Sequence, residues 1–363
     1  MRVVGFRVDA ARHIGTGHLQ RCLTLARKFD ELGWQCIFFS RDYRDGIIST
    51  MDDSGFECNI IGKSVVDIHE TDHFNWLGAS QKKDAIDTIS AINYRRLDVM
   101  IVDHYSIDYR WQQSIQEKHD MLIIVIDDLA NRVHCCTLLI DQNFWPNSSS
   151  RYDELVPSYC KKLLGPNFTM LRKDFLSLRS FIRKKPQVET ILVNFGGIGN
   201  MEVWKKFLPA LVRCRKYNFH IITGKLSPED FQCCKSMTVN ASHIVLELET
   251  NQMSHLMKIS DFALGACGST VWERFCLGLN SALIDVADNQ KDLVNYLYKQ
   301  NLIDYLGSLN SITVDSIFGY LSNLSIDNLK YQDRRKKIMQ LVDGMGASRV
   351  ANEIISIYEE RCL

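Results

Sequence analysis

Residues 3–32, VVGFRVDAARHIGTGHLQRCLTLARKFDEL, decide the fold of this chain. They open with a β-branched and aromatic run at 3–8 and pass through a turn that contains two glycines. The segment 18–32 follows, and its apolar residues recur at helical spacing. The stretch therefore predicts a strand, a glycine turn and a helix, in that order.

Short apolar runs like the first recur along the whole chain and alternate with longer segments of mixed polarity. They lie at 36–39, 99–102, 122–126, 138–140, 191–195, 219–222, 243–246, 262–264 and 282–286. Such alternation is typical of βαβ units and a parallel sheet. We therefore predict an α/β protein.

A basic stretch separates two halves of similar size. Residues 171–186, LRKDFLSLRSFIRKKP, end in a proline and suit a solvated connection between domains. We expect a first domain at 1–175, a linker at 176–186 and a second domain at 187–363. Two helices around Gly344 and Gly346 are expected to close the second domain.

The composition restricts the class of partner. Lys plus Arg equals Asp plus Glu at 43 each, so no overall field attracts nucleic acid or an anionic membrane. No run reaches the roughly 18 apolar residues of a membrane span, and the charged first residues do not fit a secretory signal. We expect a small anionic ligand that binds locally; the oligomeric state is not indicated.

The 12 cysteines lack paired C-x-x-C spacing, which disfavours a zinc knuckle or a disulfide framework. Several lie in apolar surroundings, where a free thiol behaves as a small hydrophobe. We expect a cytoplasmic protein that has no bound metal and no cofactor.

The first glycine turn presents a histidine. Gly15, Gly17 and His18 follow the first strand, at the sheet edge where open α/β proteins bind ligands. A neutral imidazole can take a proton from water near neutral pH, and Asp9, at the end of the strand, is expected to fix its tautomer. Alternatively, the glycines only allow close helix packing and His18 caps the helix.

Two further strands of the first half end in polar pairs, Asp103-His104 and Asp127-Asp128. The side chains of consecutive acids diverge on an extended chain, so a metal site is disfavoured. We expect these residues to orient His18 or the substrate. The alternative is that they cap the following helices.

A second glycine cluster, GACGST at 265–270, follows a strand and opens a helix. Free backbone N–H groups and the helix dipole would stabilise a diphosphate beside Gly268, Ser269 and Thr270. No lysine follows the glycines, so the turn is not a nucleoside-triphosphate loop. Glu273 is expected to accept ribose hydroxyls; otherwise the cluster is a plain tight turn with a favourable first-turn acid.

Two other strand ends carry candidate ligand contacts. Gly196 and Gly197 allow close approach of backbone to a ligand. After Asp288, Asn289 and Gln290 offer amides that could bond sugar substituents, although the trio 288–290 could equally cap a helix.

Seven stretches, taken in order, resemble one family, the PseG-type UDP-2,4-diacetamido-2,4,6-trideoxy-β-L-altropyranose hydrolases of pseudaminic acid biosynthesis. They are FRVD (6–9), IGTGHLQRC (14–22), VDHY (102–105), IDDLA (126–130), DQN (141–143), FGG (195–197) and LGACGSTVWER (264–274). Each motif alone is weakly specific, but the series spans residue 6 to about residue 346.

The resemblance implies a GT-B fold like that of MurG, with two Rossmann-like domains whose parallel sheets face an interdomain cleft. It implies metal-independent cleavage of the anomeric C–O bond of a nonulosonic acid precursor, with release of UDP. His18 matches the catalytic histidine, and Ser269, Thr270 and Glu273 match the nucleotide-binding residues.

The matched motifs further imply sugar contacts from Arg21, Tyr105 and Asn143. Two positions depart from the family pattern. Cys267 stands where glycine is expected, which affects the phosphate turn, and Asn280 replaces the proline of a usual Gly-Leu-Pro, which affects only a strand entry.

The sequence thus predicts a nucleotide-sugar hydrolase in which His18 activates water on the sugar face opposite UDP, with inversion at the anomeric carbon. The alternative is a GT-B glycosyltransferase that moves a related UDP-sugar onto an acceptor. A third hypothesis is a nucleotide-sugar-binding protein without catalysis.

Overall fold

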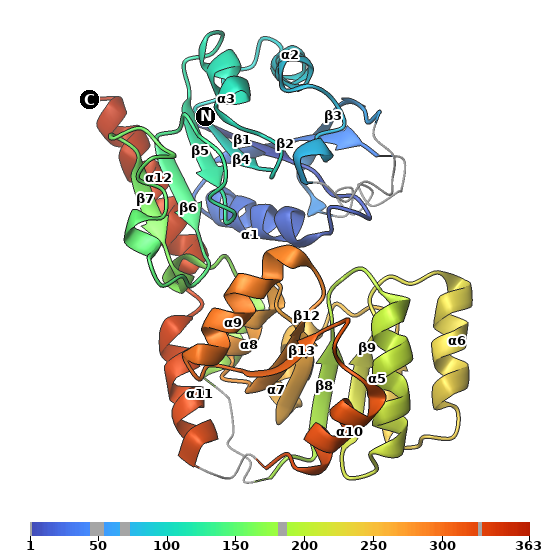
Figure 1. Ribbon diagram of the computed structural model, residues 1–363. Helices are drawn as coiled ribbons and strands as arrows, with labels where there is room; N and C mark the ends of the chain where they lie inside the picture. Colours follow the sequence, from blue (N-terminus) through green and yellow to red (C-terminus); the bar gives the residue numbers. More distant parts are fainter. Residues whose placement is uncertain (1, 44–53, 66–72, 181–186, 326–328) are drawn as a thin grey trace. The chain divides into compact units, whose positions relative to one another are not determined.

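The computed structural model describes residues 2–43, 54–65, 73–180, 187–325 and 329–363 (Figure 1). The chain divides into two compact units, Met1–Met170 with Met345–Leu363 and Leu171–Gly344. Each unit is built on one parallel sheet with helices packed against it. The predicted α/β fold class with two Rossmann-like sheets is therefore confirmed.

The first unit contains a seven-stranded parallel sheet in the order β3-β2-β1-β4-β5-β6-β7. Its strands are β1 (Val3–Val8), β2 (Gln35–Asp42), β3 (Glu57–Lys63), β4 (Val99–Asp103), β5 (Leu122–Ile126), β6 (Leu138–Asp141) and β7 (Lys161–Leu164). Its helices are α1 (Gly17–Glu31), α2 (Gln81–Ile92), α3 (Tyr109–Gln116) and α12 (Gly346–Arg361). The strand order reverses between β1 and β4, which opens a ligand position at their carboxyl ends.

The second unit contains a six-stranded parallel sheet in the order β10-β9-β8-β11-β12-β13. Its strands are β8 (Thr190–Asn194), β9 (Asn218–Ile222), β10 (Ile244–Glu247), β11 (Phe262–Ala266), β12 (Ser281–Asp285) and β13 (Asp304–Ser308). Its helices are α4 (Lys173–Arg179), α5 (Met201–Arg213), α6 (Pro228–Thr238), α7 (Met253–Ile259), α8 (Thr270–Cys276), α9 (Lys291–Lys299), α10 (Val314–Ser322) and α11 (Leu329–Leu341). Here the order reverses between β8 and β11.

Burial explains why the central strands read as nearly continuous apolar runs. Every residue of β4, β5 and β11 is buried, as expected for parallel strands covered on both faces. In α1 the buried face includes Leu19, Cys22, Leu23, Ala26 and Phe29, which is the periodicity visible in the sequence.

The C-terminal helix differs from prediction, because α12 belongs to the first unit rather than closing the second. The ring of Tyr358 packs edge-on against Trp34 at 5.2 Å, and its hydroxyl donates to Asp98 at 2.9 Å. Gly346 begins α12 so close to the carbonyl of Thr169 that a side chain there would clash. These contacts join residues far apart in sequence, so local periodicity does not reveal them.

The boundary after the first domain also differs from the predicted one at 175. Helix α4 lies in the second unit, where the guanidinium of Arg179 donates to the carbonyls of Cys276 at 2.6 Å and Val342 at 2.8 Å. The predicted linker therefore begins inside a packed helix, and residues 181–186 of it lie outside the described residues.

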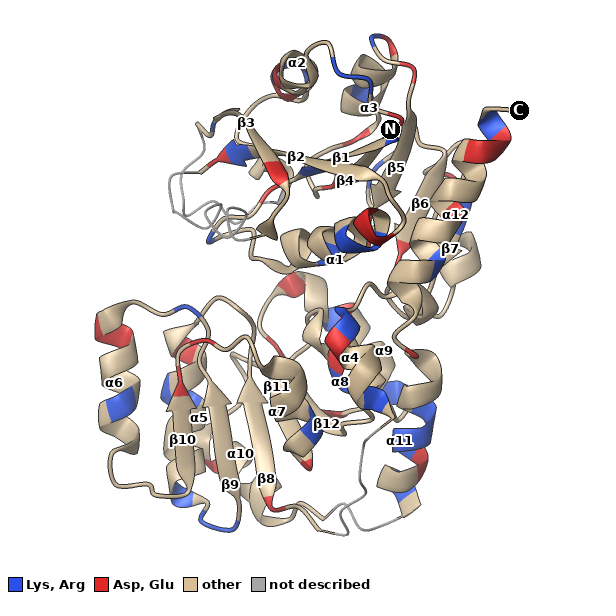
Figure 2. Ribbon diagram, turned by 180° about the vertical axis from the view of Figure 1, so that it is seen from behind, with Lys and Arg blue, Asp and Glu red and all other residues tan. Residues whose placement is uncertain are grey.

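Charges of both signs are interspersed over the helices of each unit (Figure 2), as the equal numbers of acidic and basic residues predict. Among the described helices, none has both the length and the hydropathy needed to cross a bilayer.

Candidate active site

His18 is the second residue of α1 and lies at the carboxyl edge of the first sheet. The helix begins at Gly17, and Thr16 holds the N-cap position without a side-chain cap bond. Gly15 has a φ of +85°, a conformation that side chains disfavour, so the turn requires a glycine there. His18 does not occupy the capping position, which removes the structural alternative for this residue.

The imidazole of His18 is held by Asp103, the last residue of β4. Its Nδ1 lies 2.6 Å from Oδ1 of Asp103. Because an ionised carboxylate only accepts hydrogen bonds, Nδ1 carries the proton and Nε2 keeps a lone pair. No described residue forms a hydrogen bond with Nε2. The arrangement leaves one imidazole nitrogen ready to accept a proton.

Arg21, one helical turn beyond His18, binds the same carboxylate through two bonds. Its Nε donates to Oδ2 of Asp103 at 2.6 Å and its Nη2 donates to Oδ1 at 2.7 Å. Its Nη1 donates to Asp128 at 3.2 Å, and Asp128 accepts the hydroxyl of Tyr105 at 2.6 Å. The ring of Tyr105 packs edge-on against His18 at 4.5 Å. Five of the predicted residues thus form one connected network.

Asp103 is fully buried but remains ionised. Burial by itself would raise the pKa of Asp103, yet the charge of Arg21 and the contact with His18 hold that pKa well below its ordinary value. A fixed carboxylate at this position can stabilise positive charge on His18.

Asp9 does not hold the tautomer of His18, contrary to prediction. It accepts two bonds from Arg7, at 2.6 and 2.9 Å, and one from the backbone N–H of Arg41 at 2.8 Å. Arg7 and Asp9 point to the sheet face covered by α2, where Arg7 also pairs with Asp84. Asp103 is level with Val8 in the register, and side chains alternate along a strand, so it points to the opposite face and reaches α1.

His104 belongs to the Asp9 cluster rather than to the His18 network. Its Nδ1 accepts the backbone N–H of Ser106 at 3.1 Å, so the proton sits on Nε2, which lies 3.2 Å from Asp9. Burial lowers the pKa of His104. The residue is a neutral, buried support for Asp9.

Asp127 and Asn143 lie at the carboxyl ends of β5 and β6. Asp127 is buried, accepts the N–H of Ala130 at 2.9 Å and lies 2.8 Å from Arg132; because strand β6 and not a helix follows β5, it fixes a loop and does not cap a helix, contrary to the structural alternative. The N–H of Asn143 donates to Asp141 at 2.9 Å. Burial, together with the charge of Asp128, raises the pKa of Asp141 to about 7.

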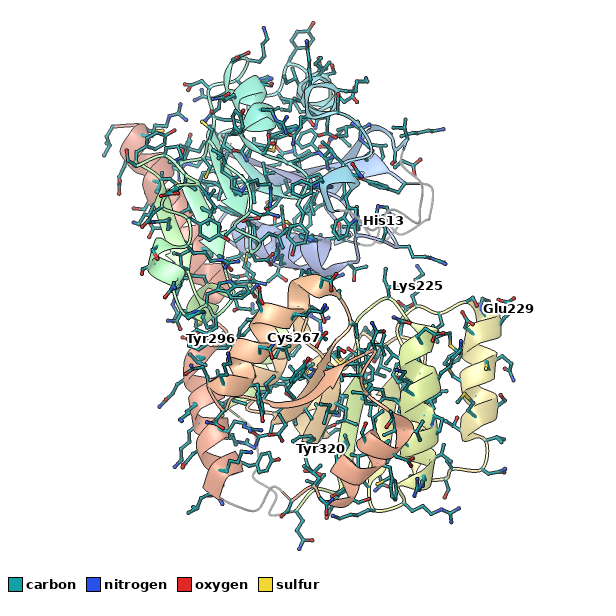
Figure 3. All side chains as sticks on the ribbon, viewed as in Figure 1. His13, Lys225, Glu229, Cys267, Tyr296 and Tyr320 are labelled. Atoms are coloured by element: carbon teal, nitrogen blue, oxygen red, sulfur yellow. The ribbon has the colours of Figure 1, made fainter. Side chains whose placement is uncertain are left out.

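An aromatic cluster beside His18 was not predicted. Trp76 stacks on Tyr105 at 5.8 Å, and the ring of His13, labelled in Figure 3, packs against Trp76 at 6.0 Å and Tyr43 at 5.4 Å. Ile14 lies in the same buried cluster. Apart from Tyr105, a predicted sugar contact, these residues come from segments without periodicity, so only their individual aromatic or apolar character could have indicated them.

The glycine turns of the second unit follow β8 and β11, the two strands at the reversal of strand order. Gly196 has a φ of +129°. The position where a Cβ would stand is open at Gly196 and Gly268, so a ligand could approach the backbone. Ser269 is exposed and makes no side-chain cap bond, and Thr270 begins α8.

Two further predicted ligand contacts, Gly197 and Gln290, form hydrogen bonds within the protein. The carbonyl of Gly197 accepts the N–H of Lys225 at 2.9 Å. The side-chain oxygen of Gln290 accepts the N–H of Val286 at 3.1 Å, so its amide oxygen serves the local turn. Asn289 is exposed within a short 3-10 helix, Asp288–Gln290.

Glu273 has a carboxylate without a hydrogen-bond partner in the described part of the chain. Burial raises the pKa of Glu273 to about 7, although the charges of Arg172 and Arg274 oppose this rise. The side chain is half-buried, and an acceptor without a protein partner that solvent can reach is suited to ligand hydroxyls.

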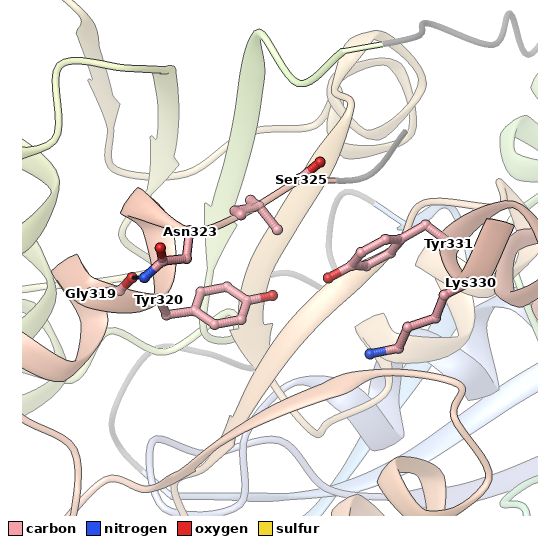
Figure 4. A pocket seen from close by; sticks show the side chains of 7 residues that line it. Gly319, Tyr320, Asn323, Ser325, Lys330 and Tyr331 are labelled. Carbon is pink, nitrogen blue, oxygen red and sulfur yellow. Dashed lines mark hydrogen bonds between the residues drawn. The ribbon is translucent and has the colours of Figure 1, made fainter. Parts of the chain in front are cut away.

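A hollow of about 490 Å³ lies elsewhere in the second unit (Figure 4). The hydroxyls of Tyr320 and Tyr331, which line it, both donate to Asp304, at 2.7 and 2.6 Å. Asp304 is the first residue of β13, so this hollow is at the amino edge of the sheet, opposite the glycine turns. Across the described residues, no three His, Cys, Asp or Glu side chains gather as a metal site.

No protein-family model matches the chain. In sequence, the chain is 21% identical to the UDP-2,4-diacetamido-2,4,6-trideoxy-beta-L-altropyranose hydrolase of Campylobacter jejuni, over 81% of this chain and 96% of that protein. It is 20% identical to the spore coat polysaccharide biosynthesis protein SpsG of Bacillus subtilis, over 98% of this chain and 99% of that protein.

In structure, the chain is similar to MurG of Acinetobacter baumannii, with a TM-score of 0.65 and 13% identity over 98% of this chain and 100% of that one. It is also similar to Arabidopsis thaliana UGT89C1 complexed with UDP, with a TM-score of 0.70 and 12% identity over all of both chains. The chain thus has the GT-B fold of these proteins, and its sequence resembles that of a UDP-sugar hydrolase, as its motifs predict.

Proposed function

We propose that this protein hydrolyses UDP-2,4-diacetamido-2,4,6-trideoxy-β-L-altropyranose to UDP and the free sugar, as a step of pseudaminic acid biosynthesis. The observation that carries the proposal is the pairing of His18 with Asp103, which leaves Nε2 of His18 without a partner among the described residues at the carboxyl edge of β1 and β4. The similarity to a hydrolase of that name, at 21% identity, supports the choice of substrate.

In the proposed reaction, Nε2 of His18 takes a proton from water while the water oxygen bonds to the anomeric carbon. The C–O bond to UDP breaks, and its electron pair leaves with the UDP. Asp103 stabilises the imidazolium until His18 releases the proton to solvent. Attack on the face opposite UDP inverts the anomeric carbon. No metal or cofactor enters this scheme.

The sugar would lie against the His18 network and the aromatic cluster. Arg21 and Asp128 are charged groups within hydrogen-bonding distance of each other, and Tyr105 joins them to the ring of His18. The apolar faces of Tyr105 and Trp76 suit the methyl groups of a 6-deoxy, N-acetylated sugar. Asn143 and Asn289 stay candidates for its acetamido groups.

UDP would bind to the second unit. The open backbone at Gly196 and Gly268 permits close approach of the diphosphate, and the hydroxyls of Ser269 and Thr270 can donate to its oxygens. Glu273 would accept the ribose hydroxyls. The buried thiol of Cys267 fills the position where the family has glycine.

We also propose a cytoplasmic location. All 12 cysteines are free thiols, which is in keeping with a reducing compartment.

The role of Glu273 predicts that uridine binding depends on pH. Since the pKa of Glu273 is about 7 and an ionised carboxylate accepts hydroxyl bonds more strongly, affinity should rise with pH through neutrality. Between pH 6 and pH 8 we expect up to about a tenfold gain, measured by calorimetry with uridine, which has no phosphate to titrate. Glu273→Gln should remove this dependence; a variant that keeps it would contradict the assignment.

The proposed activity predicts that purified protein given the UDP-sugar alone releases UDP and free sugar in equal amounts, also in EDTA. Proton NMR follows both products and the anomeric configuration of the first sugar formed. If UDP appears only after an acceptor is added, the protein is instead a glycosyltransferase. If the UDP-sugar binds and stays intact under all conditions, it is a binding protein.

A further inference from the structure

Arg274 is a buried charge that forms no ion pair in the described part of the molecule. Its side chain is fully buried, and its Nε and Nη1 have no hydrogen-bond partner among the described residues. Only Nη2 is used, and it donates to the carbonyl of Asn194 at 2.9 Å. Isolated buried charge is costly, so natural proteins normally pair it with an acid, a metal or a ligand.

The guanidinium lies between the carboxyl ends of β8 and β11. Asn194 is the last residue of β8, and the guanidinium rests so closely on Gly265 of β11 that a Cβ there would collide with it. Gly196 follows one strand end, and Cys267, labelled in Figure 3, follows the other. The guanidinium therefore lies next to the strand residues that lead into the two glycine turns.

Arg334 provides a contrast within the same unit. It too is a buried arginine on a helix, but its Nη2 donates to the carboxylate of Asp304 at 2.8 Å and its Nε to the carbonyl of Asn301 at 2.9 Å. Its charge is neutralised inside the protein. The charge of Arg274 is opposed only through space by its sequence neighbour Glu273, because these two side chains form no ion pair among the described residues.

We propose that the counter-ion of Arg274 is the diphosphate of the bound nucleotide, so that this arginine positions the diphosphate over the two glycine turns and sets the affinity for its charge. The inference rests on the proposed binding of UDP to the second unit. It assigns Arg274 a task that neither the turns nor Glu273 perform, because uridine, which lacks phosphates, would not use it.

The test compares UDP with uridine by calorimetry on the full-length protein. Arg274→Gln keeps a donor for the Asn194 carbonyl and removes the charge; we expect about 10- to 100-fold weaker UDP binding and unchanged uridine binding. Arg274→Lys should restore part of the UDP affinity. Thermal unfolding without ligand should show a Tm equal to or above that of the wild type for Arg274→Gln. Arg334→Gln is the matched control. Its Tm should be lower than that of the wild type, and its affinity for UDP relative to uridine, measured by calorimetry, should be unchanged.

If Arg274→Gln loses affinity for UDP and uridine equally, or loses none, the proposed role of Arg274 is overturned. The proposed function still stands in that case, provided that the wild-type protein binds both ligands. If Arg274→Gln does not fold, Arg274→Met replaces it. Failure of both to fold would also overturn the proposal, because a charge that lacks a partner in the free protein is not needed for folding. A wild-type protein that binds neither ligand would contradict the proposed function itself.

Discussion

Replacing His18 by asparagine is expected to lower kcat by about 10²–10⁴-fold, the range typical of a lost general base. Asparagine keeps the polarity of the side chain and can still donate to Asp103, but it offers no nitrogen that accepts a proton from water. UDP affinity should change little, because the proposed nucleotide contacts all belong to the second unit. Single-turnover assays of UDP release, beside calorimetry with UDP, measure the two effects separately.

The control for this variant is its thermal stability. His18 is not the cap of α1, since the helix starts at Gly17 with Thr16 at the cap position, so the Tm should stay near that of the wild type. A His18→Asn protein with nearly wild-type kcat would contradict the assignment and direct attention to Asp128, the other acid of the network. A protein that melts early would indicate a structural role for His18.

The strand, turn and helix at residues 3–32 could be predicted because their signals are local. A buried parallel strand gives a continuous apolar run, and a helix packed on one face gives a period near four residues. The position of His18 follows from the same logic, since ligands gather at the carboxyl ends of parallel strands. Gly15 was informative because few other residues adopt its φ of +85°.

The partner of His18 could not be predicted by the same route. Asp9 and Asp103 both end strands, and the choice between them depends on which face of the sheet each side chain takes and on which helix covers that face. The pleat turns Asp9 toward Arg7 and α2 and turns Asp103 toward Arg21 and α1. The sequence indicates where strands end but not the register between neighbouring strands. The prediction that Asp9, which is nearer along the chain, holds His18 is therefore wrong.

Long-range packing accounts for the remaining differences. Helix α12 joins the first unit through Tyr358 and Gly346, which meet residues almost 180 or more positions earlier in the chain. The buried charge of Arg274 is equally invisible in the sequence, where the residue reads as an ordinary basic group one turn into a helix. The closeness of Gly265 and the hydrogen bond to the carbonyl of Asn194 show that the side chain folds back over the sheet.

Asp103→Asn should reduce kcat about as strongly as loss of the base itself, by up to about 10⁴-fold. The amide can donate a hydrogen bond to Nδ1 of His18, which favours the tautomer with the proton on Nε2 and so removes the lone pair that accepts the proton from water. The same change deprives Arg21 of its bidentate carboxylate, and breaking such a buried pair costs about 3–5 kcal/mol of stability. Steady-state kinetics and urea unfolding measure these two consequences.

A double-mutant cycle separates the catalytic effect from the structural one. If Asp103 acts through His18, then adding Asp103→Asn to a His18→Asn protein should lower kcat little further, while the loss of stability should remain. Arg21→Lys is the matched control, because it removes the bidentate hydrogen bonding to Asp103 but keeps both the carboxylate and the imidazole. Independent, multiplicative losses of kcat in the double variant would show that Asp103 serves the reaction by another path than the tautomer of His18.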